Sequence, residues 1–358
     1  MRPTETDHVF ELMEGYVPSA ALNAALECGL FWGLAGQGRS VGELSLELGI
    51  PSARTRHWVD ILCDQGLLVR DGESVRTSEV AHRIILGRYS RETWQALASL
   101  ARERMPVILD LPGRLRDPRS TWEAQGTAAP NYFRHISQDL GTAHAYTRML
   151  HEIHVPMAAV VADQLPLGRG ARVLDLGGGS GVVAMALVRR WEGASAVVAD
   201  IPNVCDAGRA LVAQHGLSDR VGFLEIDFHR DPVPGQFDVV IMCDTGPYTS
   251  ELFAKVRAAL VPAGRFAIVE QLPGDDPPDE RARQWFTWSF RSALQDRTFR
   301  LPAAGDFSEL LAKADLVIRS SQRLPARDAI RWDMGWTLLQ GTARAVGEPI
   351  PPHGGGAG

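Results

Sequence analysis

The feature that most constrains the fold is a glycine-rich turn at residues 176–181, which separates two apolar runs. Residues 173–176 have the composition of a buried strand, and residues 182–188 that of a buried helix. Gly177, Gly178 and Gly179 remove three successive Cβ atoms, so a ligand can lie against the backbone where the helix begins. This order predicts an open α/β sheet that binds a nucleotide at the carboxyl end of its first strand.

Three further segments distinguish this turn from other glycine-rich turns. Residues 196–200 form a second strand that ends in Asp200, about 20 residues on, where an acidic residue can bind ribose hydroxyls. Residues 221–228 form a third strand that ends in Asp227 and Phe228, an acid and a ring that suit adenine. Residues 236–242 form a fourth strand, and the chain has no phosphate-binding lysine of the P-loop type.

Taken together, these segments resemble the class I S-adenosylmethionine (SAM)-dependent methyltransferases. More narrowly, the chain is similar to the winged-helix small-molecule O-methyltransferases of plant phenolics and bacterial polyketides, over roughly residues 10–345. The matching segments are residues 175–181, 199–202, 226–228, 262–265, 268–270, 297–298 and 307–311. The resemblance implies SAM as cofactor, a doubly wound Rossmann-like sheet and an antiparallel last strand. It implies these cofactor-binding residues: Asp175, Gly177, Gly179, Asp200, Asp227 and Phe228.

Length and composition favour a soluble protein of more than one domain. The chain has 358 residues, of which 45% are apolar and 22% charged, and its net charge of −6 gives no general attraction to nucleic acid or acidic membranes. Its four cysteines are far apart without a C-x-x-C pair, which argues against zinc and disulfides and suits the cytoplasm. We expect domains at residues 1–90 and 166–346, a helical connector at 91–165 and a disordered tail at 347–358.

The N-terminal domain has the pattern of a winged helix. Residues 20–34 are an apolar helix, Ser40 opens a second helix through a capping box, and Ser52 caps a third. Residues 66–70 and 74–77 then form a hairpin around an Asp-Gly turn. Such a domain can bind DNA, but residues 20–90 hold seven Lys and Arg against eight Asp and Glu, so no basic face is expected. The resemblance implies homodimerisation instead, and the apolar segment 22–34 is either the dimer surface or the domain core.

The sequence departs from the family at the catalytic base. A phenol needs help to lose its proton, and the plant enzymes use a histidine that follows the fourth strand. Residues 242–251 contain no histidine, and Asp244 is a weak base unless its pKa is raised. We expect residues 144–154 to form a helix that Pro156 kinks or restarts. The candidate bases are His144 and His151 on this helix and Tyr248 after the fourth strand.

Substrate contacts are expected from two segments. Arg148 lies one turn from His144, and Arg148 or Arg291 can recognise an acidic group on the acceptor. Trp288 belongs to an aromatic segment that can hold an aromatic ring or fill a core. No spacing of residues predicts a metal site. The acceptor atom is a phenolic oxygen or the adjacent ring carbon, and a SAM-binding protein with non-methylating chemistry, such as a hydroxylase or decarboxylase, remains an alternative.

Overall fold

The chain folds into two compact units, residues 1–112 and 113–358, which we describe separately. The structure is a computed structural model, and it describes residues 4–124, 126, 136–137, 139–272, 280–295, 303–325 and 336–345. The predicted connector, residues 91–165, is divided between the two units at residue 112. The predicted tail at residues 347–358 lies outside the described residues.

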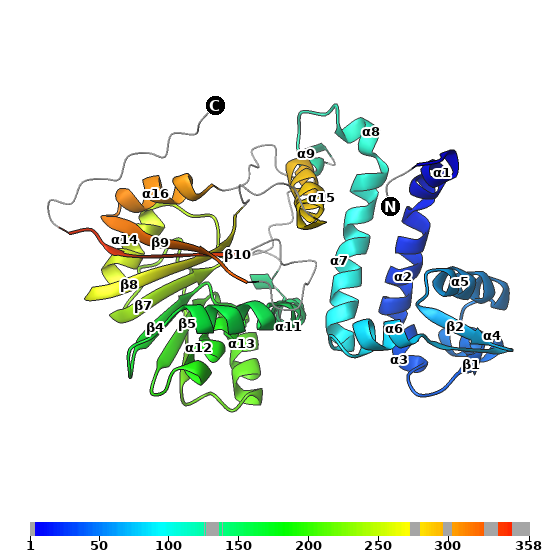
Figure 1. The fold of residues 1–358 in the computed structure, drawn as a ribbon, viewed down its shortest axis with the longest axis horizontal. Coiled ribbons are helices and arrows are strands. Elements are labelled where there is room, and N and C mark those ends of the chain that lie inside the picture. Colours follow the sequence, from blue (N-terminus) through cyan, green and yellow to red (C-terminus); the bar gives the residue numbers. More distant parts are fainter. Residues whose placement is uncertain are drawn as a thin grey trace. The chain divides into compact units, whose positions relative to one another are not determined.

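The first unit contains helices and one small sheet (Figure 1). The sheet has the order β1-β3-β2, with antiparallel pairing throughout, and the hairpin of β2 and β3 is the predicted one. Its elements are α1 (Thr6–Glu14), α2 (Tyr16–Cys28), α3 (Leu30–Gly33), β1 (Arg39–Ser40), α4 (Val41–Leu48), α5 (Ser52–Asp64), β2 (Leu68–Asp71), β3 (Ser74–Thr77), α6 (Glu79–Ala81), η1 (His82–Leu86) and α7 (Arg91–Leu109).

The helices of this unit agree with one prediction from the sequence and differ from two others. Ser40 caps α4 through the predicted box, in which the Glu43 amide donates to Ser40 Oγ and the Ser40 amide donates to the Glu43 carboxylate. The prediction that Ser52 caps the third helix was wrong, because Ser52 is already helical and its hydroxyl pairs with Ser45 Oγ at 3.0 Å. The predicted single helix at residues 20–34 is interrupted at Gly29, whose φ of 73° ends α2.

The apolar segment 22–34 forms the core of this unit. Leu26, Leu30, Phe31 and Leu34 are all at most 3% exposed, in one cluster with residues from α4, α5 and the hairpin. Of the two alternatives for this segment, the core is therefore the one that the described structure contains. Helix α1 buries none of its residues, and it carries exposed apolar side chains at Val9, Phe10, Leu12 and Met13.

The second unit is a seven-stranded sheet with the order β6-β5-β4-β7-β8-β10-β9. Strands β4 to β8 are parallel, whereas β10 is antiparallel to both β8 and β9, as the resemblance implied. Its elements are α9 (Thr121–Ala124), α11 (Leu140–Gln164), β4 (Arg172–Leu176), α12 (Val182–Arg190), β5 (Ser195–Asp200), α13 (Pro202–Gln214), β6 (Val221–Glu225), β7 (Phe237–Cys243), α14 (Ser250–Ala259), β8 (Leu260–Gln271), α15 (Glu280–Gln295), α16 (Ala304–Ala312), β9 (Leu316–Arg323) and β10 (Trp336–Ala343); α8 (Leu111–Arg114) precedes them across the unit boundary.

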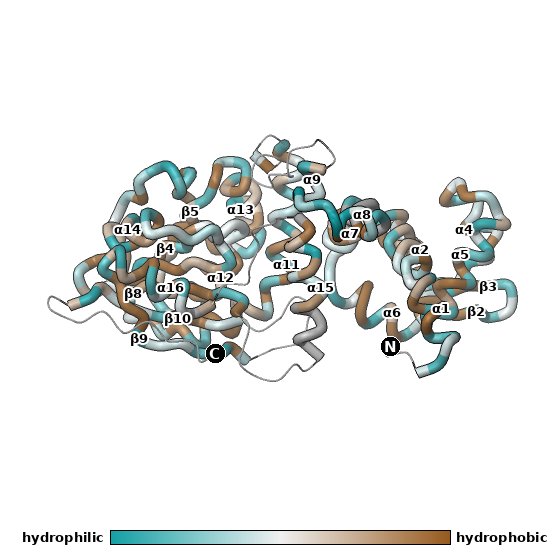
Figure 2. The backbone as a smooth tube through the Cα atoms, turned by 90° about the horizontal axis from the view of Figure 1, so that it is seen from above, coloured by the Kyte–Doolittle hydropathy of each residue, from teal (hydrophilic) through white to brown (hydrophobic). Residues whose placement is uncertain are grey.

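Helices cover both faces of the sheet, so the central strands are hydrophobic on both sides. One cluster joins the sheet to α11, α12 and α13, and a second joins the opposite face to α14 and α16 (Figure 1). The strands β4 and β8 are accordingly drawn largely in the brown of hydrophobic residues in Figure 2. The direction of the strand order reverses at β4, which lies between β5 and β7. Ligands of such sheets bind at that point, outside the carboxyl ends of the strands.

One helix is longer than the sequence predicted. Helix α11 begins four residues before His144 and continues through Pro156 to Gln164 without a restart. The proline removes one main-chain donor, and the packing of Met157, Ala158 and Val161 into the sheet core holds the helix together beyond it.

Candidate active site

The glycine turn joins β4 to α12 in a backbone conformation that favours glycine. Gly177, Gly179 and Gly181 have φ angles of 73°, 53° and 72°. A Cβ on Gly177 would overlap Thr245 and lie 3.3 Å from Phe228, whereas a Cβ on Gly179 would meet no atom within 4 Å. The turn is therefore packed against protein at Gly177 and open at Gly179, where a ligand can approach the main chain.

Asp175, a predicted cofactor residue, lies underneath this turn. Its side chain is 0% exposed, and Oδ2 accepts a hydrogen bond of 3.1 Å from the Ala184 amide in α12. Burial raises the pKa of Asp175 to about 7. A Cβ on Gly178 would collide with this carboxyl group, so Asp175 fixes the turn and the start of α12.

Asp200, at the end of β5, touches the open part of the turn. Its Oδ2 accepts from the Gly179 amide at 3.0 Å and its Oδ1 accepts from the Ile201 amide at 2.8 Å. Burial raises the pKa of Asp200 to about 6. The predicted turn and the predicted Asp200 therefore meet, and each carboxylate oxygen keeps a second lone pair for a hydroxyl donor.

The predicted adenine residues lie beside the same turn. Phe228 is 3% exposed, contacts the position of Gly177, and its carbonyl accepts 2.8 Å from Lys255 Nζ. Asp227 is half-buried, accepts from the His229 amide at 3.1 Å and forms an ion pair with Arg230 at 3.5 Å.

Beyond the switch point, acidic residues lie at the carboxyl ends of β7 and β8. Asp244 follows β7 with a φ of 52°, and its amide donates to the Val269 carbonyl in β8. Asp244 keeps some exposure to solvent, but many protein atoms surround its carboxyl group. This partial burial raises the pKa of Asp244, and the charge of His154 acts in the opposite direction. Glu270 is 9% exposed, and burial together with the charge of Asp244 raises its pKa to about 7.

Tyr248, a predicted base, is bonded to one of these acids. Its hydroxyl donates to Glu270 Oε2 at 2.8 Å, and its ring packs against Phe253 and Phe307. Burial and the Glu270 charge raise the pKa of Tyr248 well above its ordinary value. The hydroxyl is thus held as a donor, which disfavours its use as a proton acceptor.

The two predicted base histidines lie along α13. His144 Nε2 is 2.8 Å from Asp206 Oδ2, and both side chains are substantially exposed. His151 is 7% exposed, its ring stacks on that of His215, and the two Nε2 atoms are 3.2 Å apart. Burial, followed by the charges of His215 and Arg148, sets the pKa of His151 at about 4. The roles of His144 and His151 as catalytic bases therefore stay predictions. Arg148 lies between them on the same side of α11.

His154, one turn after His151 on α11, is not among the three bases selected from the sequence. Its Nδ1 is 2.9 Å from the Leu150 carbonyl, and its ring meets Trp336 edge-on with centroids 5.9 Å apart. Leu150, His154, Met157 and Val161 follow one another at helical spacing. His154 interrupts this otherwise apolar side of the helix. That pattern could have indicated that its ring faces the sheet and belongs to the site.

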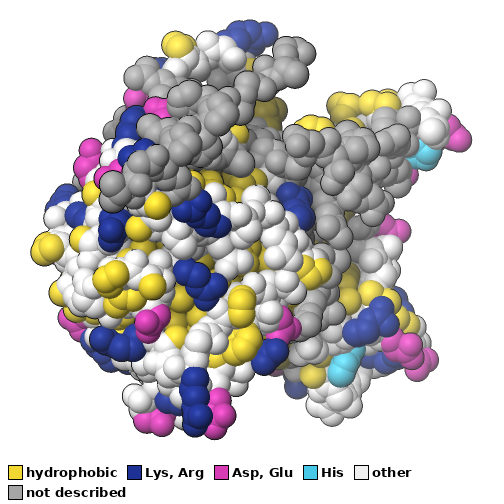
Figure 3. Space-filling view, turned by 60° about the vertical axis from the view of Figure 1, so that its left-hand side comes forward, with side chains coloured by type: hydrophobic (Ala, Val, Ile, Leu, Met, Phe, Trp, Pro, Cys, Tyr) yellow, Lys and Arg dark blue, Asp and Glu magenta, His cyan; other side chains and the backbone are white. Residues whose placement is uncertain are grey.

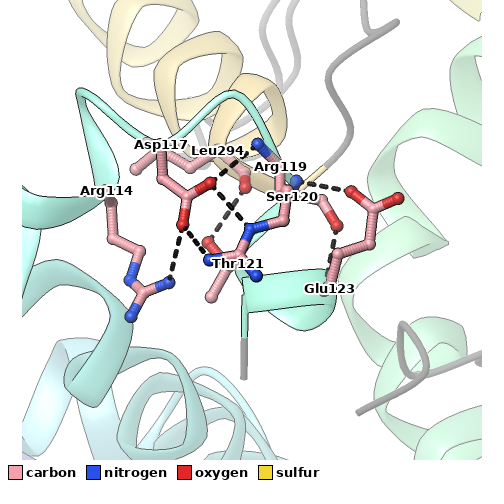
Figure 4. A network of polar contacts seen from close by, with 7 residues as sticks. All are labelled: Arg114, Asp117, Arg119, Ser120, Thr121, Glu123 and Leu294. Atoms are coloured by element: carbon pink, nitrogen blue, oxygen red, sulfur yellow. Dashed lines mark hydrogen bonds and ion pairs between the residues drawn. The ribbon is translucent and has the colours of Figure 1, made fainter. Parts of the chain in front are cut away.

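The predicted substrate residues Trp288 and Arg291 lie half-buried on α15. This helix is tied to α9 by Thr121 Oγ1, which donates to the Leu294 carbonyl at 2.9 Å, within the network of Figure 4. Arg119 binds Asp117 in the same network and lowers the pKa of that carboxyl group to about 2.

Other classes of site find little support in the described part of the chain. No group of three or more His, Cys, Asp and Glu side chains gathers there as for a metal ion. None of the helices in these ranges is long and apolar enough to cross a membrane. On the face shown in Figure 3, basic and acidic side chains are interspersed among neutral ones.

The comparisons with known proteins agree with this geometry. A family model described as the O-methyltransferase domain matches residues 110–317. A 3-hydroxy-5-methyl-1-naphthoate 3-O-methyltransferase of Streptomyces sahachiroi is 26% identical over 275 residues, which are 74% of this chain and 77% of the relative. The tetracenomycin polyketide synthesis 8-O-methyl transferase TcmO of Streptomyces glaucescens is 27% identical, over 75% of this chain and 79% of its own.

Solved structures share the fold over nearly the whole chain. The mitomycin 7-O-methyltransferase MmcR superposes with a TM-score of 0.77 at 18% identity, covering 95% of this chain and 97% of its own. Human N-acetylserotonin methyltransferase in complex with SAM has a TM-score of 0.70 at 20% identity, with 96% and 100% covered. The fold is that of a SAM-dependent methyltransferase. The chain belongs to the O-methyltransferase family, and it is a methyltransferase.

Proposed function

We propose that the enzyme transfers a methyl group from SAM to a hydroxyl oxygen of a small aromatic metabolite. The observation that carries this proposal is the 3.0 Å bond between the Gly179 amide and Asp200, beside the space that the missing Cβ of Gly179 leaves open. Two relatives support an aromatic acceptor: by their names, one acts on a naphthoate and the other in tetracenomycin polyketide synthesis.

The cofactor residues fit a nucleoside with a ribose and an adenine. Asp200 would accept both ribose hydroxyls, the open main chain at Gly179 would let the ligand approach, and Asp227 and Phe228 would bind the adenine. Gly177 would contribute by allowing the tight turn against Thr245. When bound, SAM supplies a methyl group activated by a positively charged sulfur. The chain's own residues must orient the acceptor, remove its proton and exclude water.

For the acceptor, we keep the sequence-based residues as proposals. A hydroxynaphthoate carries a carboxylate, and the guanidinium of Arg148 or Arg291 can bind such a group through two parallel hydrogen bonds. Trp288 would pack against the aromatic ring. The oxygen is preferred to the ring carbon because the matching family and the named relatives are O-methyltransferases.

Two measurements test this function. Calorimetry should give one SAM per chain, and Asp200→Ala should weaken SAM binding by about 2–4 kcal/mol, or about 30- to 1,000-fold, because two charge-assisted bonds are lost. Asp219→Ala is the matched control, since Asp219 is exposed in the loop before β6. Unchanged SAM affinity in Asp200→Ala would contradict the cofactor assignment.

The product decides the reaction type. Incubation with SAM and 3-hydroxy-1-naphthoate should release S-adenosylhomocysteine and give a product whose new methyl resonance is that of a methoxy group. A methyl group on the ring carbon would change the assignment to carbon methylation. SAM binding without any methylated product across a panel of phenols would favour non-methylating chemistry.

We also propose a homodimer formed through the N-terminal domain, in the cytoplasm. Helix α1 supports the dimer, because Val9, Phe10, Leu12 and Met13 are 46–68% exposed and none of them is buried. All four cysteines are free, as suits a reducing compartment.

Light scattering should give twice the chain mass at micromolar concentration, and Phe10→Glu with Met13→Glu should give a monomer. Sequence-specific, salt-sensitive DNA binding would favour the regulator alternative instead.

A further inference from the structure

One side of α11 brings a histidine to the carboxyl end of the sheet. Met157 Sδ lies 3.7 Å from Cys243 Sγ at the end of β7. One turn earlier, the His154 ring packs edge-on against Trp336, the first residue of β10. Trp336 pairs in register with Gln271, which directly follows Glu270. Three elements therefore fix His154 at the sheet edge where Asp244 and Glu270 lie.

The hydrogen bonding of His154 defines which nitrogen can accept a proton. Nδ1 is 2.9 Å from the Leu150 carbonyl, and a carbonyl only accepts, so Nδ1 carries the hydrogen. Nε2 then holds the lone pair. Among the described residues, none is hydrogen-bonded to this Nε2 atom.

The surroundings of His154 include a group that favours its charged form. Burial lowers the pKa of His154, and the carboxylate of Asp244 acts in the opposite direction. Among the described residues, the titratable groups on that side include Asp244 after β7, Glu270 at the end of β8 and Tyr248, which is bonded to Glu270. Cys243 at the end of β7 is a further one, and burial raises its pKa, so it stays a neutral thiol. Asp244 is thus placed to stabilise an imidazolium that forms next to it.

We propose that His154 is the general base of the reaction, with Nε2 accepting the proton of the acceptor hydroxyl and Asp244 stabilising the imidazolium. The O–H bond breaks, its electron pair stays on the oxygen, and a new N–H bond forms on Nε2. The imidazolium afterwards releases the proton to water. This inference rests on the proposed methylation of a hydroxyl group.

The other candidates are less suited to this step. His151 Nε2 lies 3.2 Å from His215 Nε2, so this nitrogen already has a partner within the protein. The Tyr248 hydroxyl donates to Glu270. His154 lies on α11, whereas the histidine of the plant enzymes follows the fourth strand, so His154 would supply the missing base from a different element.

The first test needs no ligand. In ¹⁵N-labelled full-length protein, with His154→Gln used to assign the resonances, we expect the chemical shifts of a neutral ring protonated on Nδ1. Asp244→Asn should lower the pKa of His154. A ring protonated on Nε2, or a His154 pKa that does not respond to Asp244→Asn, would overturn the proposal.

The second test uses 3-hydroxy-1-naphthoate and its methyl ether. The hydroxy compound should shift the Nε2 resonance, and the methyl ether should not, because it has no proton to donate. His154→Gln should lower kcat by about 10²–10⁴-fold and flatten the acid limb of the pH profile, with SAM affinity unchanged.

The arms of the experiment separate two failures. If His151→Gln loses activity and His154→Gln keeps it, the proposal about His154 is wrong while the proposed function stands. If the wild-type enzyme methylates no phenol, the proposed function fails, and the tautomer in the free protein still decides the state of His154. Equal melting temperatures of wild type and His154→Gln exclude misfolding as the cause of a loss.

Discussion

The two halves of the sheet's carboxyl edge are built in different ways. On the half that we propose for the cofactor (the cofactor half), the turn after β4 and Asp200 at the end of β5 meet because their strands are neighbours, and the contacts use main-chain amides. On the half that we propose for the acceptor (the acceptor half), the side chains come from α11, the residue after β7, β8 and β10, namely His154, Asp244, Glu270 and Trp336. Local sequence therefore encodes the first half, whereas the second depends on how distant segments pack.

Gly177→Ala should have the largest effect and tests how tightly the cofactor half is built. A residue with a side chain at this φ costs about 1–2 kcal/mol, and overlap with Thr245 and Phe228 adds about 1–3 kcal/mol. We expect the free energy of unfolding, measured in urea without SAM, to fall by about 3–4 kcal/mol and SAM binding to be lost.

Gly179→Ala is the matched comparison, because its φ is also positive but its Cβ would lie in open space. Only the backbone cost of about 1–2 kcal/mol should appear in its unfolding free energy. Equal losses in the two variants would mean that the contacts at Gly177 do not constrain the turn.

The same contrast explains what the sequence could predict. The strands predicted at residues 173–176, 196–200, 221–228 and 236–242 correspond to β4, β5, β6 and β7, because parallel strands in such a sheet are largely apolar runs. The third strand was predicted too long, since β6 ends at Glu225. The turn and Asp200 were predicted together for the same reason: they belong to one strand-helix-strand unit, and the structure joins them by a hydrogen bond.

The acceptor half could not be predicted in this way. His151 and His154 are one turn apart, and only the packing of α11 decides that one lies on His215 and the other on Trp336. Pro156 also favoured a shorter helix, since the sequence does not show that the sheet core holds the segment beyond it.

His151→Leu tests whether the α13 side of α11 is structural. In the unfolded chain His151 binds a proton near its ordinary pKa of 6.5, but in the folded protein only near 4. Between these values the unfolded state binds more protons, so stability falls as the pH is lowered, by at most about 3 kcal/mol from this group.

In His151→Leu, the unfolding free energy measured by denaturation from pH 7 to pH 4 should therefore fall less steeply than in the wild type. An unchanged slope would indicate that His151 is not buried in its neutral form, and it would return His151 to the candidates for the acceptor half.

The pH dependence of SAM binding tests the proposed role of Asp200 in the cofactor half. Ribose hydroxyls donate to an ionised carboxylate, and the pKa of Asp200 is about 6. Affinity should therefore decrease below pH 6, to roughly one tenth of its pH 7 value at pH 5. Calorimetry on Asp200→Asn gives the reference, since its weaker binding should lack this decrease. The same pH dependence in both proteins would assign it to another group.

His144→Ala should have the smallest effect, and it tests where the acceptor half ends. His144 and Asp206 form an ion pair with side chains 41% and 56% exposed, and surface pairs of this kind stabilise by about 0–1 kcal/mol.

If His144 serves only this pair, kcat should stay within about twofold, whereas the loss of a general base lowers kcat by about 10²–10⁴-fold. Steady-state kinetics at pH 7 distinguishes these outcomes without any change in fold. A large loss of kcat would restore the sequence-based assignment of His144, and it would extend the acceptor half from β7 and β8 toward the start of α13.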